Sequence, residues 1–357
     1  MSEPLHRQSV MAGGGVYNQH SQPQHVAGDD GLPLLERACE AVALDGARTD
    51  LLVADYGSSQ GRNSLAPMRA AIGSLRRRVA PEAPISIVHT DLPGNDFAAL
   101  FTTLQADPES YLRADANAFA YAAGRSFYER LFPASRVTLG WSSITVHWLS
   151  AVPGPLHGQI FSPLGTREER AAYAARAAQD WERFLAHRRE ELVPGGQLVI
   201  VGSGADERGR CGAEGLLGLA NEALRELVAD GSLSAAEYEA MVVPTYYRTR
   251  QEFLAPLERG PGPLALEECS ETALEDPLWA RYEQSGDLAG FAAGAADFLR
   301  AFSEPSLFAA IAAARGAAEA TGLADEFYAR VREAIEQRPA DARCAWRLVL
   351  MRLAKGA

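Results

Sequence analysis

Two aspartates stand where short apolar runs end, and their placement is the first sign of chemistry in this chain. One run of four apolar residues leads into Asp55, after which Gly57 and Gly61 follow four residues apart. A second run, residues 85–89, ends shortly before Asp91. Glycines at a strand-to-helix turn let a ligand approach the backbone, and an acid at the end of the next strand can accept both hydroxyls of a ribose. The pair predicts a nucleoside pocket at the carboxyl edge of a parallel sheet.

The spacing Asp-x-Gly-x-x-x-Gly differs from the Gly-x-Gly-x-x-Gly pattern that aims a helix N-terminus at a pyrophosphate. S-Adenosylmethionine has no phosphate; it offers a sulfonium, an amino-acid group and an adenosine. Asp55 suits the cationic amino group of that molecule. The glycine turn alone is also compatible with an ordinary strand–helix connection, and Asp91 is the residue that favours a binding site.

Strands and helices alternate along the first two thirds of the chain, which predicts an α/β fold with a doubly wound parallel sheet. After residue 204 the pattern becomes mostly helical, and we expect this part to form a cap over the carboxyl edge of the sheet. The predicted strands begin at residue 51 and cover 85–89, 137–141, 197–202, 264–268 and 344–353. The predicted helices are 32–46, 64–79, 166–192, 212–230, 234–242 and 286–302.

The composition excludes several classes of function. The net charge of −12 over 357 residues and the lack of a basic stripe argue against nucleic-acid binding. Four cysteines lie far apart without a CxxC pair, which predicts a reducing, cytoplasmic location and no zinc site. We also expect no signal peptide and no membrane span, because no apolar run approaches the roughly 18 residues that a span needs. Alanine- and arginine-rich helices suggest a bacterial source.

Several segments, in order, resemble the SABATH family of plant carboxyl methyltransferases, which act on salicylate, benzoate and jasmonate. Residues 91–97 read DLPGNDF, residues 126–133 read SFYERLFP, and residues 191–196 read ELVPGG. Further similarity is seen at residues 142–150 and 300–305, and at Met11-Ala12-Gly13-Gly14 with Tyr17, Ser21 and Gln24. The resemblance implies a Rossmann-like methyltransferase core with a helical cap and S-adenosylmethionine as cofactor. It divides the chain into a lid (1–30), a core (31–204), a cap (205–303) and a C-terminal part of the core (304–357).

The resemblance also implies a role for each matching residue. The methionine moiety of the cofactor would lie by Asp55 and Asn63 at the Gly57 turn, and the ribose by Asp91. The adenine would lie by Leu92, Ser126 and Phe127, although Phe127 fits core packing equally well. The acid substrate would take hydrogen bonds from Gln24 and Trp148, with His147 either touching substrate or lying in the core. Tyr17 would contact the cofactor from the lid.

The sequence departs from the family pattern at several positions. Ala12 replaces a lysine, Ile144 replaces a tyrosine, and Ala213-Glu214 aligns with an aromatic wall, which predicts a wider and more polar pocket. Met241-Val242 replaces a pair that lies near magnesium in some relatives, so we expect no metal. Relatives are often homodimers, which makes a homodimer possible here.

The implied reaction is methylation of a small organic acid to its methyl ester. Because a carboxylic acid has a pKa near 4, it is ionised at neutral pH and needs no acid or base residue. Two alternatives remain at this point: N-methylation of a small heterocycle, and cofactor binding without catalysis. A nicotinamide dehydrogenase fits poorly, because the phosphate-binding glycine pattern is missing.

Overall fold

The protein is described by a computed structural model over residues 10–44, 50–258 and 264–356. Residues 1–9 of the predicted lid and residues 45–46 of the first predicted helix lie outside these ranges. Within the described residues, no helix is long and apolar enough to cross a membrane.

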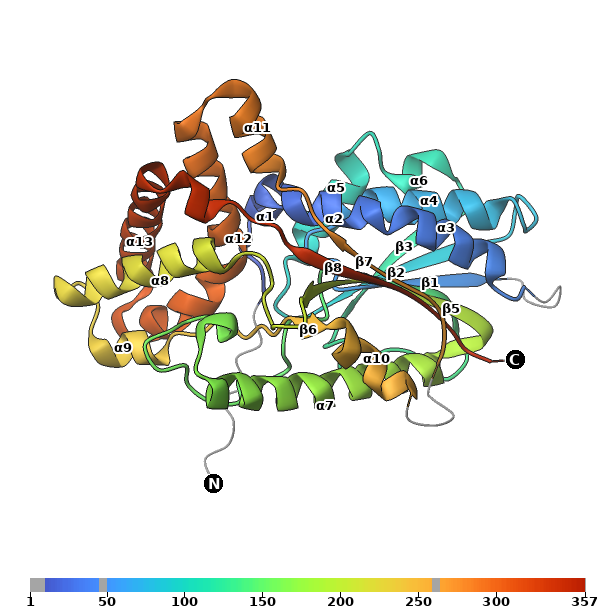
Figure 1. Cartoon of the computed structure of the whole chain (residues 1–357). Helices are drawn as coiled ribbons and strands as arrows, with labels where there is room; N and C mark the ends of the chain where they lie inside the picture. The colour runs from blue at the N-terminus through green and yellow to red at the C-terminus, as the bar shows by residue number, and fades with distance from the viewer. Residues whose placement is uncertain (1–9, 45–49, 259–263, 357) are drawn as a thin grey trace.

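A mixed sheet forms the centre of the molecule (Figure 1). Over the described residues it has eight strands, in the order β3-β2-β1-β4-β5-β8-β7, with β6 beside β5. Strands β1 to β5 are parallel to their neighbours, whereas β8 is antiparallel to β5 and β7 is antiparallel to β8. The strands are β1 (Leu51–Tyr56), β2 (Ile85–Asp91), β3 (Ala118–Gly124), β4 (Val137–Ser143), β5 (Leu192–Ala205), β6 (Arg248–Thr249), β7 (Ala265–Ala273) and β8 (Arg347–Ala354).

Helices cover both faces of the sheet, as a doubly wound fold requires. Helices α3, α4 and α6 lie on one face, and α7 and α10 lie on the other (Figure 1). The helices of this part are α1 (Val16–His20), α2 (Gln22–Asp30), α3 (Leu32–Ala41), α4 (Leu65–Arg76), α5 (Phe97–Ala106), α6 (Tyr111–Ala114), α7 (Arg167–Glu191) and α10 (Arg250–Glu258), with short 3-10 turns at Arg62–Ser64 and Ser162–Leu164.

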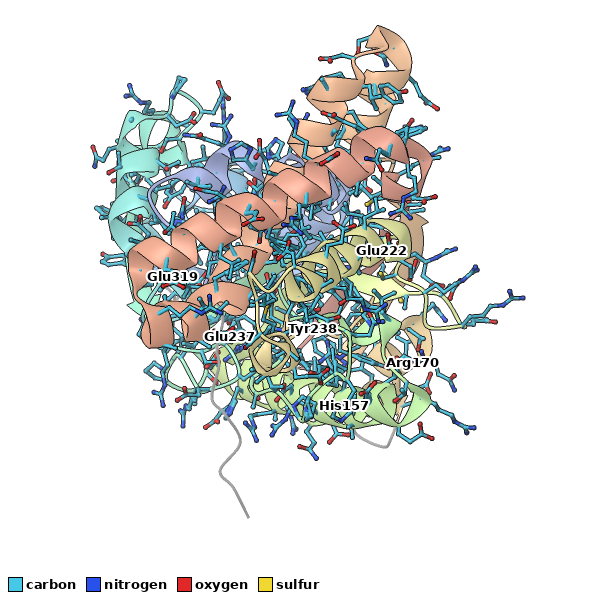
Figure 2. The ribbon with its side chains drawn as sticks, turned by 90° about the vertical axis from the view of Figure 1, so that its left-hand side faces the viewer. His157, Arg170, Glu222, Glu237, Tyr238 and Glu319 are labelled. Carbon is cyan, nitrogen blue, oxygen red and sulfur yellow. The ribbon has the colours of Figure 1, made fainter. Side chains whose placement is uncertain are left out.

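The cap consists of the helices α8 (Glu214–Ala229), α9 (Ala235–Ala240), α11 (Pro277–Ser285), α12 (Leu288–Arg315) and α13 (Ala317–Gln337), followed by a 3-10 turn at Pro339–Ala342. These helices pack against one another through phenylalanines such as Phe291 and Phe327. The two side chains belong to the same hydrophobic cluster as the core residues of the sheet. Figure 2 shows the cap side, where Glu237 of α9 and Glu319 of α13 both pair with the guanidinium of Arg315. These pairs fasten the C-terminal end of α12 to its neighbours.

The cap is larger than the sequence indicates. The predicted boundary at residues 303–304 falls inside α12, and α13 packs against α12 and α8. Strand β7, which lies within the predicted cap, belongs to the sheet instead. Cap and core segments therefore alternate along the C-terminal half, and the predicted division at 304 needs this correction.

The structure confirms the predicted helix 166–192, but the strand that follows it begins earlier than the sequence indicates. The predicted helix 166–192 is α7, which starts at a capping box formed by Thr166 and Glu169. The segment 194–196, Pro-Gly-Gly, follows this helix and lies within β5, where the register against β4 shifts. A β-bulge absorbs extra residues in this way, so the strand begins five residues earlier than predicted. Strand β3 has no counterpart among the predicted elements.

Candidate functional site

Three neighbouring cavities lie where β1, β2 and β4 end, and Tyr17 and Ile144 line all three. The central cavity, of about 550 Å³, lies between these strand ends and α12. The strand-end cavity, of about 630 Å³, follows β1 and β2, and the polar cavity, of about 380 Å³, lies under α2. Together these cavities contain every site residue predicted from the sequence: Tyr17, Gln24, Asp55, Gly57, Asn63, Asp91, Leu92, Ser126, Phe127, His147 and Trp148.

The strand-end cavity is built around Asp91, the last residue of β2. Its Oδ2 accepts a hydrogen bond from the backbone N–H of Ser59 at 2.7 Å, and its Oδ1 accepts one from Leu92 N–H at 2.7 Å. Burial raises the pKa of Asp91 to about 6, although these two backbone donors act in the opposite direction. Ser126 and Phe127 lie in the same cavity. A carboxylate held between two backbone donors and facing apolar side chains can accept hydroxyl groups of a ligand.

Both glycines of the turn after β1 have positive φ, Gly57 at 84° and Gly61 at 87°. A Cβ on Gly57 would lie 2.0 Å from Cγ2 of Thr145, so only glycine fits there. Gly61 was expected to make room for a ligand, but its side faces Leu100, and it lines none of the three cavities. Of the two glycines, Gly57 therefore shapes the site, and Gly61 serves the turn.

The polar cavity contains several buried side-chain oxygens that have no hydrogen-bond partner. They belong to Gln24, Ser58, Ser59, Asn63 and Ser143. Because a buried polar atom without a partner costs roughly 1–3 kcal/mol, a cluster of them indicates that a polar ligand completes the site. These amide and hydroxyl groups can accept hydrogen bonds from an ammonium group and can donate hydrogen bonds to a carboxylate.

Asp55 lines this polar cavity and is held by two neighbours that the sequence did not point to. Its Oδ2 accepts hydrogen bonds from Ser64 Oγ at 2.5 Å and from His89 Nδ1 at 2.8 Å. The other ring nitrogen of His89 lies 2.9 Å from the hydroxyl of Tyr111. All four side chains are buried. This chain fixes the carboxylate of Asp55 at the end of β1.

The central cavity is lined by aromatic, aliphatic and a few polar side chains, and none of its described lining residues is charged. Gln24 and His147 contribute polar atoms, and Trp148 separates this cavity from the strand-end cavity, because it lines both. Burial, reinforced by the charge of Arg248, lowers the pKa of His147 to about 3. His147 is therefore neutral at physiological pH. Its ring stacks on that of Tyr247, with the ring centroids 5.6 Å apart, and its buried Nδ1 has no hydrogen-bond partner. Its pKa makes it a poor general base.

Ile144 occupies an unusual backbone conformation at the point where the cavities meet. Its φ is 50°, which a β-branched residue rarely adopts, and its N–H donates to Val201 O at 2.8 Å. Such strain is often found at ligand sites. Facing it, Tyr17 of α1 has a raised pKa, chiefly through burial and secondly through the charge of Asp91. Tyr17 therefore stays protonated and can act as a hydrogen-bond donor.

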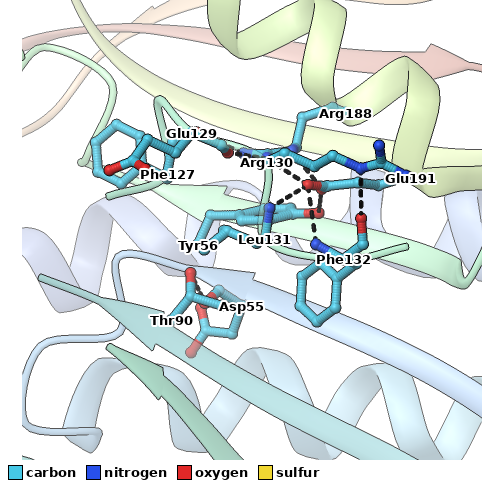
Figure 3. A network of polar contacts seen from close by, with 10 residues as sticks. All are labelled: Asp55, Tyr56, Thr90, Phe127, Glu129, Arg130, Leu131, Phe132, Arg188 and Glu191. Carbon is cyan, nitrogen blue, oxygen red and sulfur yellow. Dashed lines mark hydrogen bonds and ion pairs between the residues drawn. The ribbon is translucent and has the colours of Figure 1, made fainter. Parts of the chain in front are cut away.

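A buried ion pair holds the loop that carries Ser126 and Phe127 (Figure 3). Arg188 and Glu191, both fully buried on α7, are joined by two hydrogen bonds of 2.8 and 2.9 Å. Arg188 also donates to the carbonyl of Phe127 at 2.7 Å, and Glu191 accepts from the backbone N–H of Leu131 at 2.6 Å. The pair thereby fixes one wall of the strand-end cavity from behind.

The lining of the central cavity differs from the sequence-based prediction at two places. Ala213 and Glu214 do not line the central cavity; Glu214 instead accepts hydrogen bonds from the backbone of Cys211 and Gly212. The prediction that these two residues widen the pocket and make it more polar was therefore wrong. The wall is aromatic, and it is formed by Tyr247, Phe298, Phe302 and Trp346. The spacing of Phe298 and Phe302 in a predicted helix was the available signal for part of it.

Among the residues that the structure describes, no three His, Cys, Asp or Glu side chains lie close enough to hold a metal ion.

Comparison with known proteins gives a consistent result. A family model described as "SAM dependent carboxyl methyltransferase" matches residues 6–355. Methyltransferase LUC1 of a Fusarium species is 34% identical over 263 residues, covering 72% of this chain and 69% of that protein. The salicylate/benzoate carboxyl methyltransferase of Arabidopsis thaliana is 29% identical over 313 residues, covering 83% and 80%. These relatives are fungal and plant proteins, so they give no support to a bacterial source.

Among solved structures, a loganic acid methyltransferase with SAH superposes with a TM-score of 0.78 at 22% identity. The match covers 98% of this chain and 99% of that one. At this identity the likeness supports the fold, which is the Rossmann-like methyltransferase fold expected from the sequence.

Proposed function

The chain belongs to the SAM-dependent carboxyl methyltransferases, and from this premise we propose how its three cavities divide the work. The enzyme methylates the carboxylate of a small organic acid with S-adenosylmethionine as cofactor. In our proposal the cofactor occupies the strand-end and polar cavities, and the acid occupies the central cavity. The observation that carries this division is that Tyr17 and Ile144 line all three cavities, so groups bound in them can meet at one point.

The residues present fit the cofactor. Asp91 would accept the ribose hydroxyls, with the adenine against Leu92 and Phe127 in the strand-end cavity. Asp55 and Asn63 would hold the amino-acid group, which offers partners to the unpaired oxygens of the serines and of Asn63 in the polar cavity, whereas Gln24 would face the acid. When bound, S-adenosylmethionine supplies a methyl group on a positively charged sulfur.

The residues around the acid need only orient it and exclude water. Gln24 and Trp148 would donate hydrogen bonds to the carboxylate, since an amide N–H₂ and an indole N–H are donors. No base is required, because the acid is ionised at neutral pH and His147 is neutral there. Orientation of two reactants can contribute roughly 7–11 kcal/mol to catalysis at its upper range. We propose that residues 10–30 act as the lid that excludes water.

Replacing Gln24 with alanine tests the assignment of the acid site. The loss of one hydrogen bond to a charged group costs about 1.5–3 kcal/mol, so KM for the acid should rise about tenfold to a hundredfold. The affinity for S-adenosylhomocysteine, measured by calorimetry, should stay within about twofold of the parent, a change of under 0.5 kcal/mol. Gln22→Ala on the exposed side of the same helix is the matched control. An unchanged KM with a weakened cofactor affinity would assign Gln24 to the cofactor instead.

The pH dependence of cofactor binding tests Asp91. Its pKa of about 6 means that the carboxylate takes up a proton below that pH and loses acceptor capacity. S-Adenosylhomocysteine should therefore bind about tenfold more weakly at about pH 5 than at about pH 8. In Asp91→Asn the affinity should be lower throughout and should not change over this range. Calorimetry at four pH values measures both, and a parent affinity that is constant over the range contradicts the assignment.

We also propose that the protein is a homodimer and that it is cytoplasmic. A homodimer is supported by Phe119 and Tyr121, which are 43% and 51% exposed on the edge strand β3, a surface that association would cover. A cytoplasmic location is supported by the separation of the four cysteines in the sequence. Light scattering of the purified protein and fractionation of the source cells would test them.

A further inference from the structure

A fourth cavity lies directly behind the central cavity, on the far side of Pro23, Phe298 and Trp346, which line both. This distal cavity measures about 270 Å³. Its lining residues come mainly from the cap helices α8, α11 and α12 and from the segment that leads into β8. Pro23, Phe298 and Trp346 therefore form a wall that the two cavities share.

The distal cavity is suited to apolar groups. Most of its lining comes from side chains such as Leu216, Leu278, Ala295 and Ala342. Its one carboxylate, Asp276, is already occupied, because it accepts hydrogen bonds from the backbone of Leu278 at 2.9 Å and of Cys344 at 3.0 Å. A ligand group that enters this space meets no free charge, and an uncharged hydrocarbon group fits it best.

The central cavity is itself large for a single aromatic ring. Its volume of about 550 Å³ is close to that of the strand-end cavity, about 630 Å³, in which we place an adenosine. A benzoate-sized acid held by Gln24 and Trp148 would leave much of the aromatic wall without contact, and unfilled apolar space loses packing energy.

Two aromatic rings form most of the shared wall. Phe298 stands on α12 and Trp346 on the segment before β8, with their rings 6.3 Å apart in an edge-to-face arrangement. Trp346 also touches Tyr247 at 5.7 Å, and so belongs to the aromatic wall of the central cavity. If either ring turned away from the other, the two cavities would join into one elongated apolar space.

We propose that the substrate is an elongated, apolar monocarboxylic acid whose far end passes between Phe298 and Trp346 into the distal cavity. This inference rests on the proposed placement of the carboxylate at Gln24 and Trp148. It restricts the substrate to acids with one charge and a long hydrocarbon body. Ala295, which lines the distal cavity alone, is then a specificity-determining residue that touches only the end of the substrate.

The test compares straight-chain acids from butanoate to dodecanoate, and benzoate, as substrates of the full-length enzyme. Each methylene that leaves water should raise kcat/KM by up to about fourfold until the distal cavity is filled. In Ala295→Leu the ratio of kcat/KM for dodecanoate to that for butanoate should fall at least about tenfold, because the added side chain fills the cavity. Ala309→Leu, on the exposed side of the same helix, should leave the ratio unchanged.

Binding of the same acids to the complex with S-adenosylhomocysteine, measured by calorimetry, gives a second readout that does not need turnover. Ala342→Leu fills the same cavity from the other side and replaces Ala295→Leu if that variant does not fold. The inference is overturned if kcat/KM does not change with chain length, or if Ala295→Leu leaves the ratio for dodecanoate and butanoate unchanged. Methylation of short acids would still support the proposed function in either case. If no acid of any length is methylated, the proposed function itself fails.

Discussion

Deletion of residues 1–20 should abolish methyl transfer and leave a folded protein. The deletion removes Tyr17, which lines all three cavities, and Met11, which lines two of them. It opens the site to water and removes the contacts that hold the segment, including the bonds from Asn18 Nδ2 to Gln60 O and Thr103 Oγ1, both 3.0 Å. Because loss of alignment alone can cost about a hundredfold, we expect turnover to fall about a thousandfold or more when water also enters.

The fold should survive this deletion, because the sheet begins at Leu51 and the first helices packed on it, α2 and α3, begin after residue 20. Circular dichroism and thermal unfolding check the fold, and a turnover assay with labelled cofactor checks the activity. Deletion of residues 1–9 alone keeps every contact named above and serves as the control. Near-normal turnover after deletion of 1–20 would show that this segment is not a lid.

Replacement of Arg188 with methionine should destabilise the protein by about 3–5 kcal/mol, because it leaves the buried carboxylate of Glu191 without its positive partner. The guanidinium also lies over the ring of Tyr56 at 4.5 Å and holds the carbonyl of Phe127. The loop that carries Ser126 should therefore loosen, and the affinity for S-adenosylhomocysteine should fall as well. Denaturant unfolding and calorimetry measure the two effects.

Arg189→Met is the matched control, since Arg189 is exposed on the same turn of α7, and its effect should stay within about 0.5 kcal/mol. The double variant Arg188→Met, Glu191→Leu removes both charges and should regain a large part of the lost stability. If Arg188→Met unfolds at the same denaturant concentration as the parent, the pair does not support the loop as described.

The strand ends could be predicted from the sequence because the signal there is local. Asp55 and Asp91 follow apolar runs directly, and Gly57 marks a turn that only glycine fits. The lid was predicted only from the family resemblance, since a glycine-rich segment such as residues 11–15 gives no periodic pattern, and it stays a proposal. The structure places Tyr17 and Gln24 beside the strand ends, whereas the ligands they bind stay predictions.

The missing parts depend on contacts between residues distant in sequence. Strand β3 is an edge strand rich in alanine, which lacks the β-branched run by which buried strands are recognised. Trp346 reaches the site only because β8 inserts antiparallel beside β5. His89 was part of an apolar run, and its bond to Asp55 depends on β1 and β2 being neighbours in register. None of these pairings leaves a local mark in the sequence.

The product of the reaction tests the central claim most directly. The full-length protein, given S-adenosylmethionine with a deuterated methyl group and a panel of carboxylic acids and nitrogen heterocycles, should yield methyl esters. Mass spectrometry should locate the label on the carboxylate oxygen, and mild alkaline hydrolysis should release it as labelled methanol. A label that resists hydrolysis because it sits on nitrogen, or cofactor binding without any labelled product, would contradict the account.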